Sequence, residues 1–293
     1  MQFLTLDRAS FTYGSSQPVA PLVRRVIAEN PSKFTYHGTG TYVIGGDEHG
    51  RGDVVVIDPG PTLDSHREAL ASALAGCTVR AILVTHCHAD HSPLAAWLSA
   101  ESGAPTVAFG PHGDDAWDIG EDPVVHEPEN DSASADDPAT EPAEPTEPAE
   151  PVVEESTDRD FVPDLVAVTG DVVAAADGWV ITGLHTPGHT SNHLCFALDD
   201  GEVRTLFTGD HVMGWSTTVV SPPDGDMAAY LDSLRVVAGR RDDVAIPTHG
   251  PPIPNPSAFV DELIAHRLER ERQVLDAVRG GLATIPEMVE VLY

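Results

Sequence analysis

The densest group of chemically active side chains lies at residues 85–91, which read Thr-His-Cys-His-Ala-Asp-His. The apolar run at 81–84 is typical of a buried strand, so the group begins where a strand ends. Two histidines and the aspartate occupy alternating positions, and an extended chain points such side chains to one side while Cys87 points away. Imidazole nitrogen and carboxylate oxygen are ligands that zinc accepts, so the spacing predicts a metal site rather than a histidine-rich surface loop. The candidate ligands here are His86, His88, Asp90 and His91.

Three later loops carry side chains of the same kind. Each loop follows an apolar run that predicts a strand, and glycine or proline shapes each one. Their candidate ligands are His189, Asp210 and His249. If the strand ends meet, four loops supply seven ligands, and this set suits two zinc ions better than one. Manganese and iron accept similar ligands, so Mn²⁺ and Fe²⁺ are alternatives to Zn²⁺.

Strands and helices must position these loops. Short apolar runs bounded by turn residues predict strands at 41–44, 53–57, 81–84, 105–109, 165–168, 171–173, 179–182, 193–198, 203–207 and 244–246. Helices are predicted near 64–75, 92–97, 226–238, 256–279 and 284–287. Ser92 is the predicted cap of the second helix, and Pro93 its first residue. The many strands after residue 160 without helices between them indicate a mixed or largely antiparallel sheet.

Composition limits the partners and the compartment. The 293 residues carry a net charge of −31, and Lys33 is the only lysine among 16 basic residues. Such acidity disfavours DNA and other polyanions as general partners. The three cysteines are too few and too widely spaced for a disulfide framework, which favours a reducing compartment. No signal peptide pattern and no apolar run of about 20 residues is present, so we expect a cytoplasmic protein without a membrane partner.

The segment at 127–160 differs from the rest of the chain. It contains 13 acidic residues and six prolines against a single basic residue, Arg159. Such a segment cannot bury enough apolar area to offset the entropy that ordering costs. We therefore predict an acidic, disordered insertion with polyproline character. A role in regulation or in recruiting a basic partner is the alternative to a solvated insertion without function.

The ligand motifs, in this order and spacing, resemble the metallo-β-lactamase superfamily over residues 40–252. The resemblance implies an α/β (α+β) fold, a four-layer αββα sandwich with its site at one edge of the two sheets. The implied domains are a catalytic domain at 1–255 and a C-terminal helical extension at 256–293, similar to a winged-helix-like domain cut short. One metal would be held by His86, His88 and His189, the second by Asp90, His91 and His249, with Asp210 between them. Asp58 would support the loops without binding metal.

Two stretches, 209–219 and 266–273, resemble the branch that contains the endoribonuclease beta-lactamase-like protein 2. The leading hypothesis is a hydrolase in which a hydroxide between two zinc ions, oriented by Asp90, attacks a substrate that the sequence leaves unassigned. Single-stranded RNA is the substrate of the branch with the closest resemblance, although the net charge of −31 argues against it. A small ester or thioester, cleaved as in glyoxalase-II-like thioesterases or lactonases, is the alternative and tolerates the acidic surface better. Thr217 and Thr218 are candidates for substrate contacts. A metal-binding interaction module without turnover is the alternative from another class, and the sequence leaves the oligomeric state open.

Overall fold

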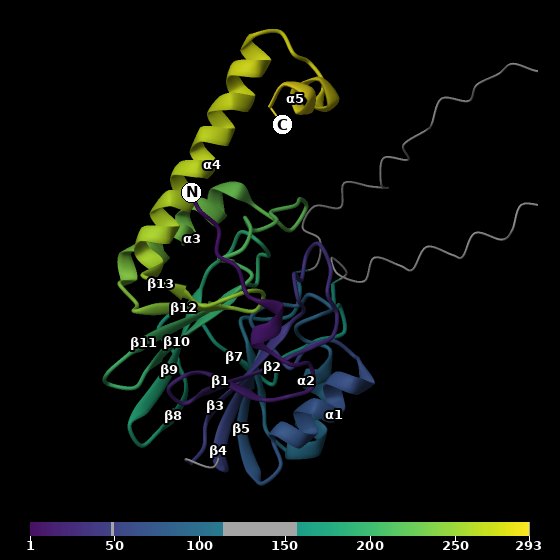
Figure 1. The fold of residues 1–293 in the computed structure, drawn as a ribbon, viewed down its shortest axis with the longest axis vertical. Coiled ribbons are helices and arrows are strands. Elements are labelled where there is room, and N and C mark those ends of the chain that lie inside the picture. Colours follow the sequence, from purple (N-terminus) through teal and green to yellow (C-terminus); the bar gives the residue numbers. More distant parts are fainter. Residues whose placement is uncertain (48–49, 114–156, 293) are drawn as a thin grey trace, which may run out of the picture.

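The computed structural model describes residues 1–47, 50–113 and 157–292. Two mixed β-sheets face each other, and helices cover the outer face of each sheet (Figure 1). This arrangement confirms the predicted α/β fold with four αββα layers. Among the described residues, no helix combines the length and the apolar character that crossing a membrane requires.

The first sheet has seven strands that neighbour one another in chain order. They are β1 (Gln17–Ala20), β2 (Val23–Ile27), β3 (Gly40–Gly45), β4 (Gly52–Ile57), β5 (Cys77–Leu83), β6 (Thr106–Ala108) and β7 (Leu165–Val166). The first four pair antiparallel, whereas β4 to β7 pair parallel. Helices α1 (Asp64–Ala73) and α2 (Leu94–Ser102) connect the parallel strands and pack on the outer face of this sheet.

The second sheet has six strands in the order β13-β12-β11-β10-β9-β8. They are β8 (Val172–Ala176), β9 (Trp179–His185), β10 (Leu194–Asp199), β11 (Arg204–Gly209), β12 (Val244–Pro247) and β13 (Ile253–Pro254). Only β11 and β12 pair parallel, so the prediction of a mixed, largely antiparallel sheet is confirmed. Helix α3 (Met227–Arg240) crosses between the two parallel strands.

The apolar pattern of the strands explains the layers. In β5 and β3, alternate residues such as Leu83 and Tyr42 enter the core between the sheets. Their neighbours Ile82 and Val43 pack toward the outer helices instead. Because successive side chains point to opposite faces, a strand buried on both faces reads as a continuous apolar run. Such runs were the clearest strand signals in the sequence.

The C-terminal helices start inside the fold and end away from it. Helix α4 spans Pro256–Arg279, as predicted, and its first turns bury Val260 and Leu263 against α3 and the second sheet. The later turns extend beyond the sheets and meet the short helix α5 (Ile285–Leu292; Figure 1). The start of the predicted extension thus belongs to the outer helical layer of the sandwich, and a winged-helix-like character for the remainder stays a prediction.

Two local expectations differ from the structure. Ser92 does not cap α2; its hydroxyl donates to Asp158 at 2.6 Å, and no side chain caps the helix. Residues 127–156 of the predicted insertion lie outside the described residues, but 157–160 are described. Thr157 forms a β-bridge with His88, so this end of the segment is attached to the histidine-rich loop.

Candidate metal centre

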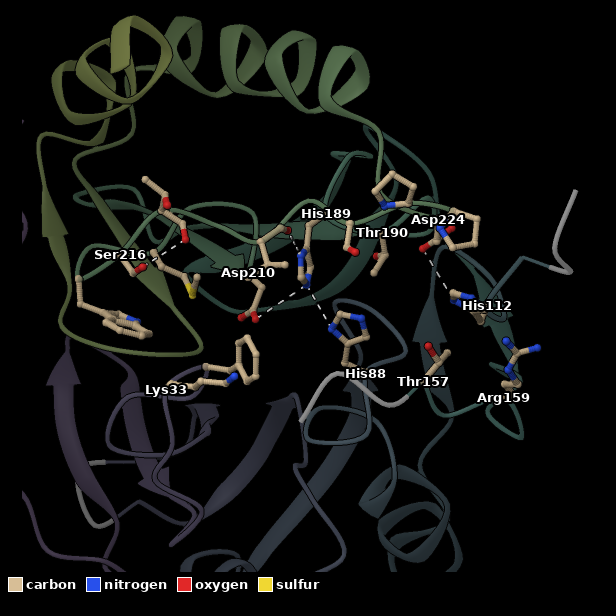
Figure 2. A pocket seen from close by; sticks show the side chains of 18 residues that line it. Lys33, His88, His112, Thr157, Arg159, His189, Thr190, Asp210, Ser216 and Asp224 are labelled. Carbon is tan, nitrogen blue, oxygen red and sulfur yellow. Dashed lines mark hydrogen bonds and ion pairs between the residues drawn. The ribbon is translucent and has the colours of Figure 1, made fainter. Parts of the chain in front are cut away.

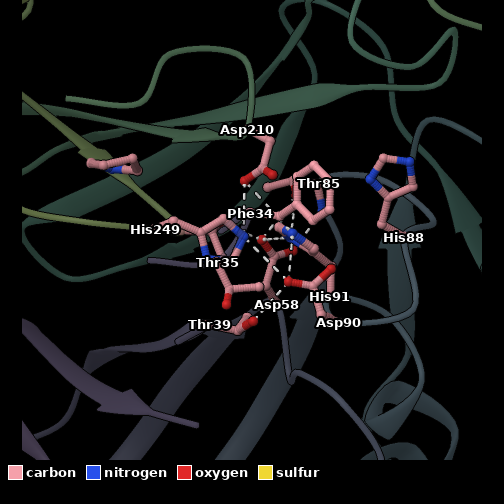
Figure 3. A network of polar contacts seen from close by, with 12 residues as sticks. Phe34, Thr35, Thr39, Asp58, Thr85, His88, Asp90, His91, Asp210 and His249 are labelled. Carbon is pink, nitrogen blue, oxygen red and sulfur yellow. Dashed lines mark hydrogen bonds and ion pairs between the residues drawn. The ribbon is translucent and has the colours of Figure 1, made fainter. Parts of the chain in front are cut away.

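Strand ends from both sheets bring the predicted ligands together. The loop after β5 carries four of them, and the loops after β9, β11 and β12 carry one each. These seven side chains are His86, His88, Asp90, His91, His189, Asp210 and His249. Figure 3 shows Asp90, His91, Asp210 and His249 pointing toward one another between the loops.

Three imidazoles form the first cluster. Nε2 of His86 lies 3.0 Å from Nδ1 of His88, which lies 3.2 Å from Nε2 of His189. Burial lowers the pKa of His88 to about 3, and burial together with neighbouring histidines holds the pKa of His86 well below its ordinary value. These histidines are therefore neutral near pH 7, and neutral imidazole is the form that binds a metal ion.

A carboxylate and two imidazoles form the second cluster. Oδ2 of Asp90 lies 3.2 Å from Nε2 of His249 and 3.5 Å from Nε2 of His91. Although burial opposes it, the carboxylates of Asp90 and Asp210 raise the pKa of His91 to about 9. Burial alone would raise the pKa of Asp90, but His91 and His249 beside it hold this pKa below its ordinary range. Asp90 is therefore ionised near neutral pH.

Asp210 lies between the two clusters. Its Oδ1 is 3.4 Å from Nε2 of His249 and 3.6 Å from Nε2 of His91. Its Oδ2 is 3.9 Å from Nε2 of His189, which belongs to the first cluster. One carboxylate thus faces both ligand groups, the position that the resemblance implied for a residue shared by two metals.

The residues present fit a pair of metal ions. Each cluster offers three nitrogen or oxygen atoms within 4.8 Å of one another. Nε2 of His91 and Oδ1 of Asp210 are buried and have no hydrogen-bond partner among the described residues. Within the same part of the chain, only histidines form ion pairs with Asp90 and Asp210. A bound cation would balance these buried carboxylates while the imidazoles stay neutral.

Asp58 contacts two of the ligand loops and belongs to neither ligand cluster. Its Oδ1 accepts a hydrogen bond from the backbone N–H of Thr85 at 2.8 Å. Its Oδ2 accepts bonds from the hydroxyls of Thr85 and Thr248, and lies 2.9 Å from Nδ1 of His91. The buried carboxylate therefore joins the end of β4 to the loops after β5 and β12 (Figure 3).

Outer hydrogen bonds also fix which ring nitrogen faces the centre. Nδ1 of His189 lies 2.6 Å from the carbonyl of Val219, and Nδ1 of His249 lies 3.3 Å from the carbonyl of Gly38. Because each Nδ1–H donates outward, each Nε2 keeps its lone pair for a metal ion. The hydroxyl of Thr39 donates to Asp90 at 2.7 Å and orients that carboxylate in the same way.

Cys87 and His193 belong to neither of the two ligand clusters. Cys87 is buried, its Sγ accepts a hydrogen bond from Asn192, and burial raises its pKa to about 11. Nε2 of His193 accepts a hydrogen bond from the backbone N–H of Asp210. His193 therefore positions the loop that carries Asp210.

A pocket of about 230 Å³ opens beside the ligand cluster (Figure 2). His88, His189 and Asp210 form part of its wall, so a molecule in the pocket reaches both ligand groups. Apolar side chains also line it: Phe34, Met213, Trp215, Val219, Pro222 and Pro223. A centre with this geometry can polarise a carbonyl group whose apolar substituent lies in the pocket.

The two predicted substrate contacts differ in position. Thr217 lines the pocket, and its contact with substrate stays a prediction. Thr218 is buried, and its hydroxyl donates to the carbonyls of Asp210 and His211. Thr218 therefore holds the loop of Asp210 and is not among the residues that line the pocket, and its contact with substrate stays a prediction.

Local sequence patterns do not identify several of the residues that line the pocket. Lys33 and Phe34 share one loop, whereas His112, Trp215 and Asp224 come from parts of the chain far from it, and all five line the pocket. Their approach depends on the tertiary fold, so no local spacing reveals them. Lys33 alone stands out in the sequence, because it is the only lysine.

Residues 38–249 match the Metallo-beta-lactamase superfamily, and this range contains all seven candidate ligands. The chain belongs to the metallo-beta-lactamase superfamily. Solved structures of this superfamily share its fold at low sequence identity. A beta-lactamase domain protein from Burkholderia ambifaria has a TM-score of 0.62 and 21% identity, over 91% of this chain and 80% of that protein. A metallo-beta-lactamase family protein from Thermus thermophilus has a TM-score of 0.59 and 23% identity, over 87% and 82%.

Relatives within the superfamily include named thioesterases. An atrochrysone carboxyl ACP thioesterase from Aspergillus chevalieri is 30% identical over 287 residues, 94% of this chain and 75% of the relative. A protein of the same name from Passalora fulva is also 30% identical, over 94% of this chain and 69% of its own. The lactamase-like protein ptaB from Pestalotiopsis fici is 26% identical over 94% and 74%. These relatives give no support to the predicted endoribonuclease branch.

Proposed function

We propose that this superfamily member is a metal-dependent thioesterase that hydrolyses an acyl thioester. The main support is the 30% identity, over 94% of the chain, to a named thioesterase. The ligand cluster beside an apolar pocket supplies chemistry that suits this reaction. Water adds to the thioester carbonyl, the carbon–sulfur bond breaks, and the products are a carboxylic acid and a thiol.

In this proposal, the two clusters hold two metal ions, and zinc fits their nitrogen and oxygen ligands. His86, His88 and His189 would hold one ion, Asp90, His91 and His249 would hold the other, and the carboxylate of Asp210 faces both clusters. Mn²⁺ and Fe²⁺ accept the same ligand types and remain alternatives. When bound, such ions lower the pKa of water and polarise a carbonyl oxygen.

The residues around the ions orient the reactants. The Asp90 carboxylate is ionised and is held by Thr39, so it can accept a hydrogen bond from the attacking water and align it. Phe34, Met213 and Trp215 shield the acyl portion from bulk water. Orientation of this kind supplies much of the rate acceleration in hydrolytic sites.

Thiol release from acyl-N-acetylcysteamine thioesters tests this proposal. Zinc-loaded protein should release thiol, and Asp90→Asn should lower kcat/KM by about 100-fold or more. Asp53→Asn, which changes an exposed carboxylate paired with Arg80, should keep the activity and serves as the matched control. Thioesters that stay intact beside zinc-loaded protein, while labelled single-stranded RNA is cleaved, would overturn the proposal.

The arginines near the C-terminus do not build an RNA groove at this pocket. Among the arginines in the last sixty residues of the sequence are these six: Arg235, Arg240, Arg241, Arg267, Arg270 and Arg272. Arg235, Arg240 and Arg272 form ion pairs with neighbouring aspartates. None of the six, all of which are described, lines the pocket. We therefore do not propose RNA as the substrate.

A further inference from the structure

We propose that Lys33 binds an anionic group on the acyl portion of the substrate, so that the enzyme prefers acyl thioesters carrying a carboxylate. This inference rests on the proposed thioesterase function. Lys33 lies on the loop between β2 and β3 and lines the same pocket as His88, His189 and Asp210. A substrate at the ligand cluster is therefore within the pocket that Lys33 borders.

The pocket has a basic residue at each end. Figure 2 shows Lys33 at one end and Arg159 at the other, with Asp210, His189 and His88 between them. A thioester whose carbonyl lies at the ligand cluster extends toward both ends, because it has an acyl arm and a thiol arm. The other residues at each end therefore decide which arm that end takes.

The end that holds Lys33 is aromatic. Nζ of Lys33 lies 4.6 Å from the centre of the Phe34 ring. On the same loop, Tyr36 stacks on Trp215 with ring centres 4.7 Å apart, which brings the Trp215 loop to this end. An apolar wall with one cation suits an acyl chain that ends in an acidic group.

The opposite end carries more polar groups, although Pro222 and Pro223, which precede Asp224, also line the pocket. Asp224 accepts a hydrogen bond from the backbone N–H of Ser191 and lies 3.8 Å from Nδ1 of His112. Thr157 lines this end as well and is bridged to His88. Hydrogen-bonding groups of this kind suit the amides of a thiol carrier arm, which assigns the acyl arm to the Lys33 end.

The charge of Lys33 is unusual for this chain and available to a ligand. Lys33 is the only lysine in a molecule whose net charge is −31. Its side chain is exposed, and it forms no ion pair within the described ranges 1–47, 50–113 and 157–292. An acidic surface repels anionic substrates, so a local ammonium group decides whether a carboxylate is tolerated at this position.

Two thioesters of equal length test the proposal. Glutaryl- and pentanoyl-N-acetylcysteamine differ by the terminal carboxylate, and their shared leaving thiol is neutral. Wild-type protein should prefer the glutaryl thioester by about tenfold in kcat/KM, as expected for one hydrogen-bonded charge pair. Lys33→Met should reduce this ratio to about one, mainly through KM, whereas Lys33→Arg should retain most of it. Arg80→Met, which removes an exposed cation paired with Asp53, is the control and should keep the full ratio.

The remaining outcomes decide against the proposal or separate it from the proposed function. An unchanged ratio in Lys33→Met, or a wild-type preference for the pentanoyl thioester, overturns it. A Lys33 effect confined to coenzyme A thioesters also overturns it, because the anion would then lie on the carrier.

If no thioester is hydrolysed, the thioesterase function fails. Acetylation of Lys33, followed by mass spectrometry, then still tests anion binding: slower labelling with glutarate than with the uncharged glutaramide supports it, and equal labelling overturns it.

Discussion

At the scale of single residues, Asp58 shows how a side chain outside the ligand cluster sets its geometry. One carboxylate holds Thr85, His91 and Thr248 at 2.8–2.9 Å, and these residues lie on two different ligand loops. The residue adopts a positive φ of 47°, a conformation that non-glycine residues rarely take. The contacts that Asp58 makes therefore outweigh a local backbone cost.

Asp58→Asn is predicted to weaken zinc binding by about 10–100-fold, because the amide cannot accept all the bonds that orient His91 and the two loops. Competition with a chromophoric zinc chelator measures the effect. Asp53→Asn, with its exposed carboxylate on the same strand, is the matched control and should bind zinc like the wild type. Equal affinity in both variants would show that Asp58 does not position the ligands.

His66 gives a prediction for the pH dependence of stability. Its Nε2 lies 2.9 Å from the hydroxyl of Thr41, and burial lowers its pKa from 6.5 to about 4. The folded state thus binds fewer protons than the unfolded state between these values. The stabilising contribution is complete above about pH 6.5 and is lost as the pH falls toward 4, by at most about 3 kcal/mol. Urea titrations of His66→Gln should show a weaker fall of the free energy of unfolding over this range; a fall as steep as in the wild type would contradict the assignment.

At the scale of elements, helix α4 combines two environments. Val260 and Leu263 are fully buried in the layer that covers the second sheet, while Leu268 and Val278 farther along are more than 40% exposed. The first turns of α4 are thus part of the sandwich. The helix was predictable in full because Pro256 and Gly280 mark its ends in the sequence.

Leu263→Ala and Leu268→Ala form a matched pair on this helix. Leu263→Ala is predicted to lower the free energy of unfolding by about 2–5 kcal/mol, since it leaves a cavity in a packed core. Leu268→Ala, at a position 42% exposed, should change it by about 0.5 kcal/mol or less. Chemical denaturation measures both values. Similar small effects in the two variants would mean that α4 is not an integral part of the sandwich.

Strands β1 and β2 show where sequence patterns fail at this scale. The sequence pattern of residues 1–30 predicts no strand, although β2 pairs with β3 along its whole length. Two arginines interrupt its apolar pattern. Arg25 is buried because it donates to the carbonyl of Gly250, 225 positions away, and Arg24 donates to the carbonyl of Gly50. Partners so distant in the chain exist only after folding, so a local pattern cannot identify the strand.

At the scale of the whole molecule, the clustering of the candidate ligands was predictable and the pocket was not. Histidines and aspartates that follow apolar runs can be recognised in the sequence as candidate ligands by their chemical type. The strand order then brings them to one edge of the two sheets. The pocket combines Lys33, His112 and Trp215 from separate loops, so its shape depends on the complete fold. Likewise, Thr217 and Thr218 are neighbours with opposite surroundings, a difference that only the path of the loop decides.

The measurement that tests the proposed two-metal thioesterase site most directly is thioester hydrolysis during a zinc titration of metal-free protein. Thiol release should rise with added zinc and level off at two equivalents per chain, because the two ligand clusters are joined by Asp210 and both take part. A plateau at one equivalent would contradict a two-metal centre. Binding of two zinc ions without thioester hydrolysis would contradict the proposed function while leaving the metal centre intact.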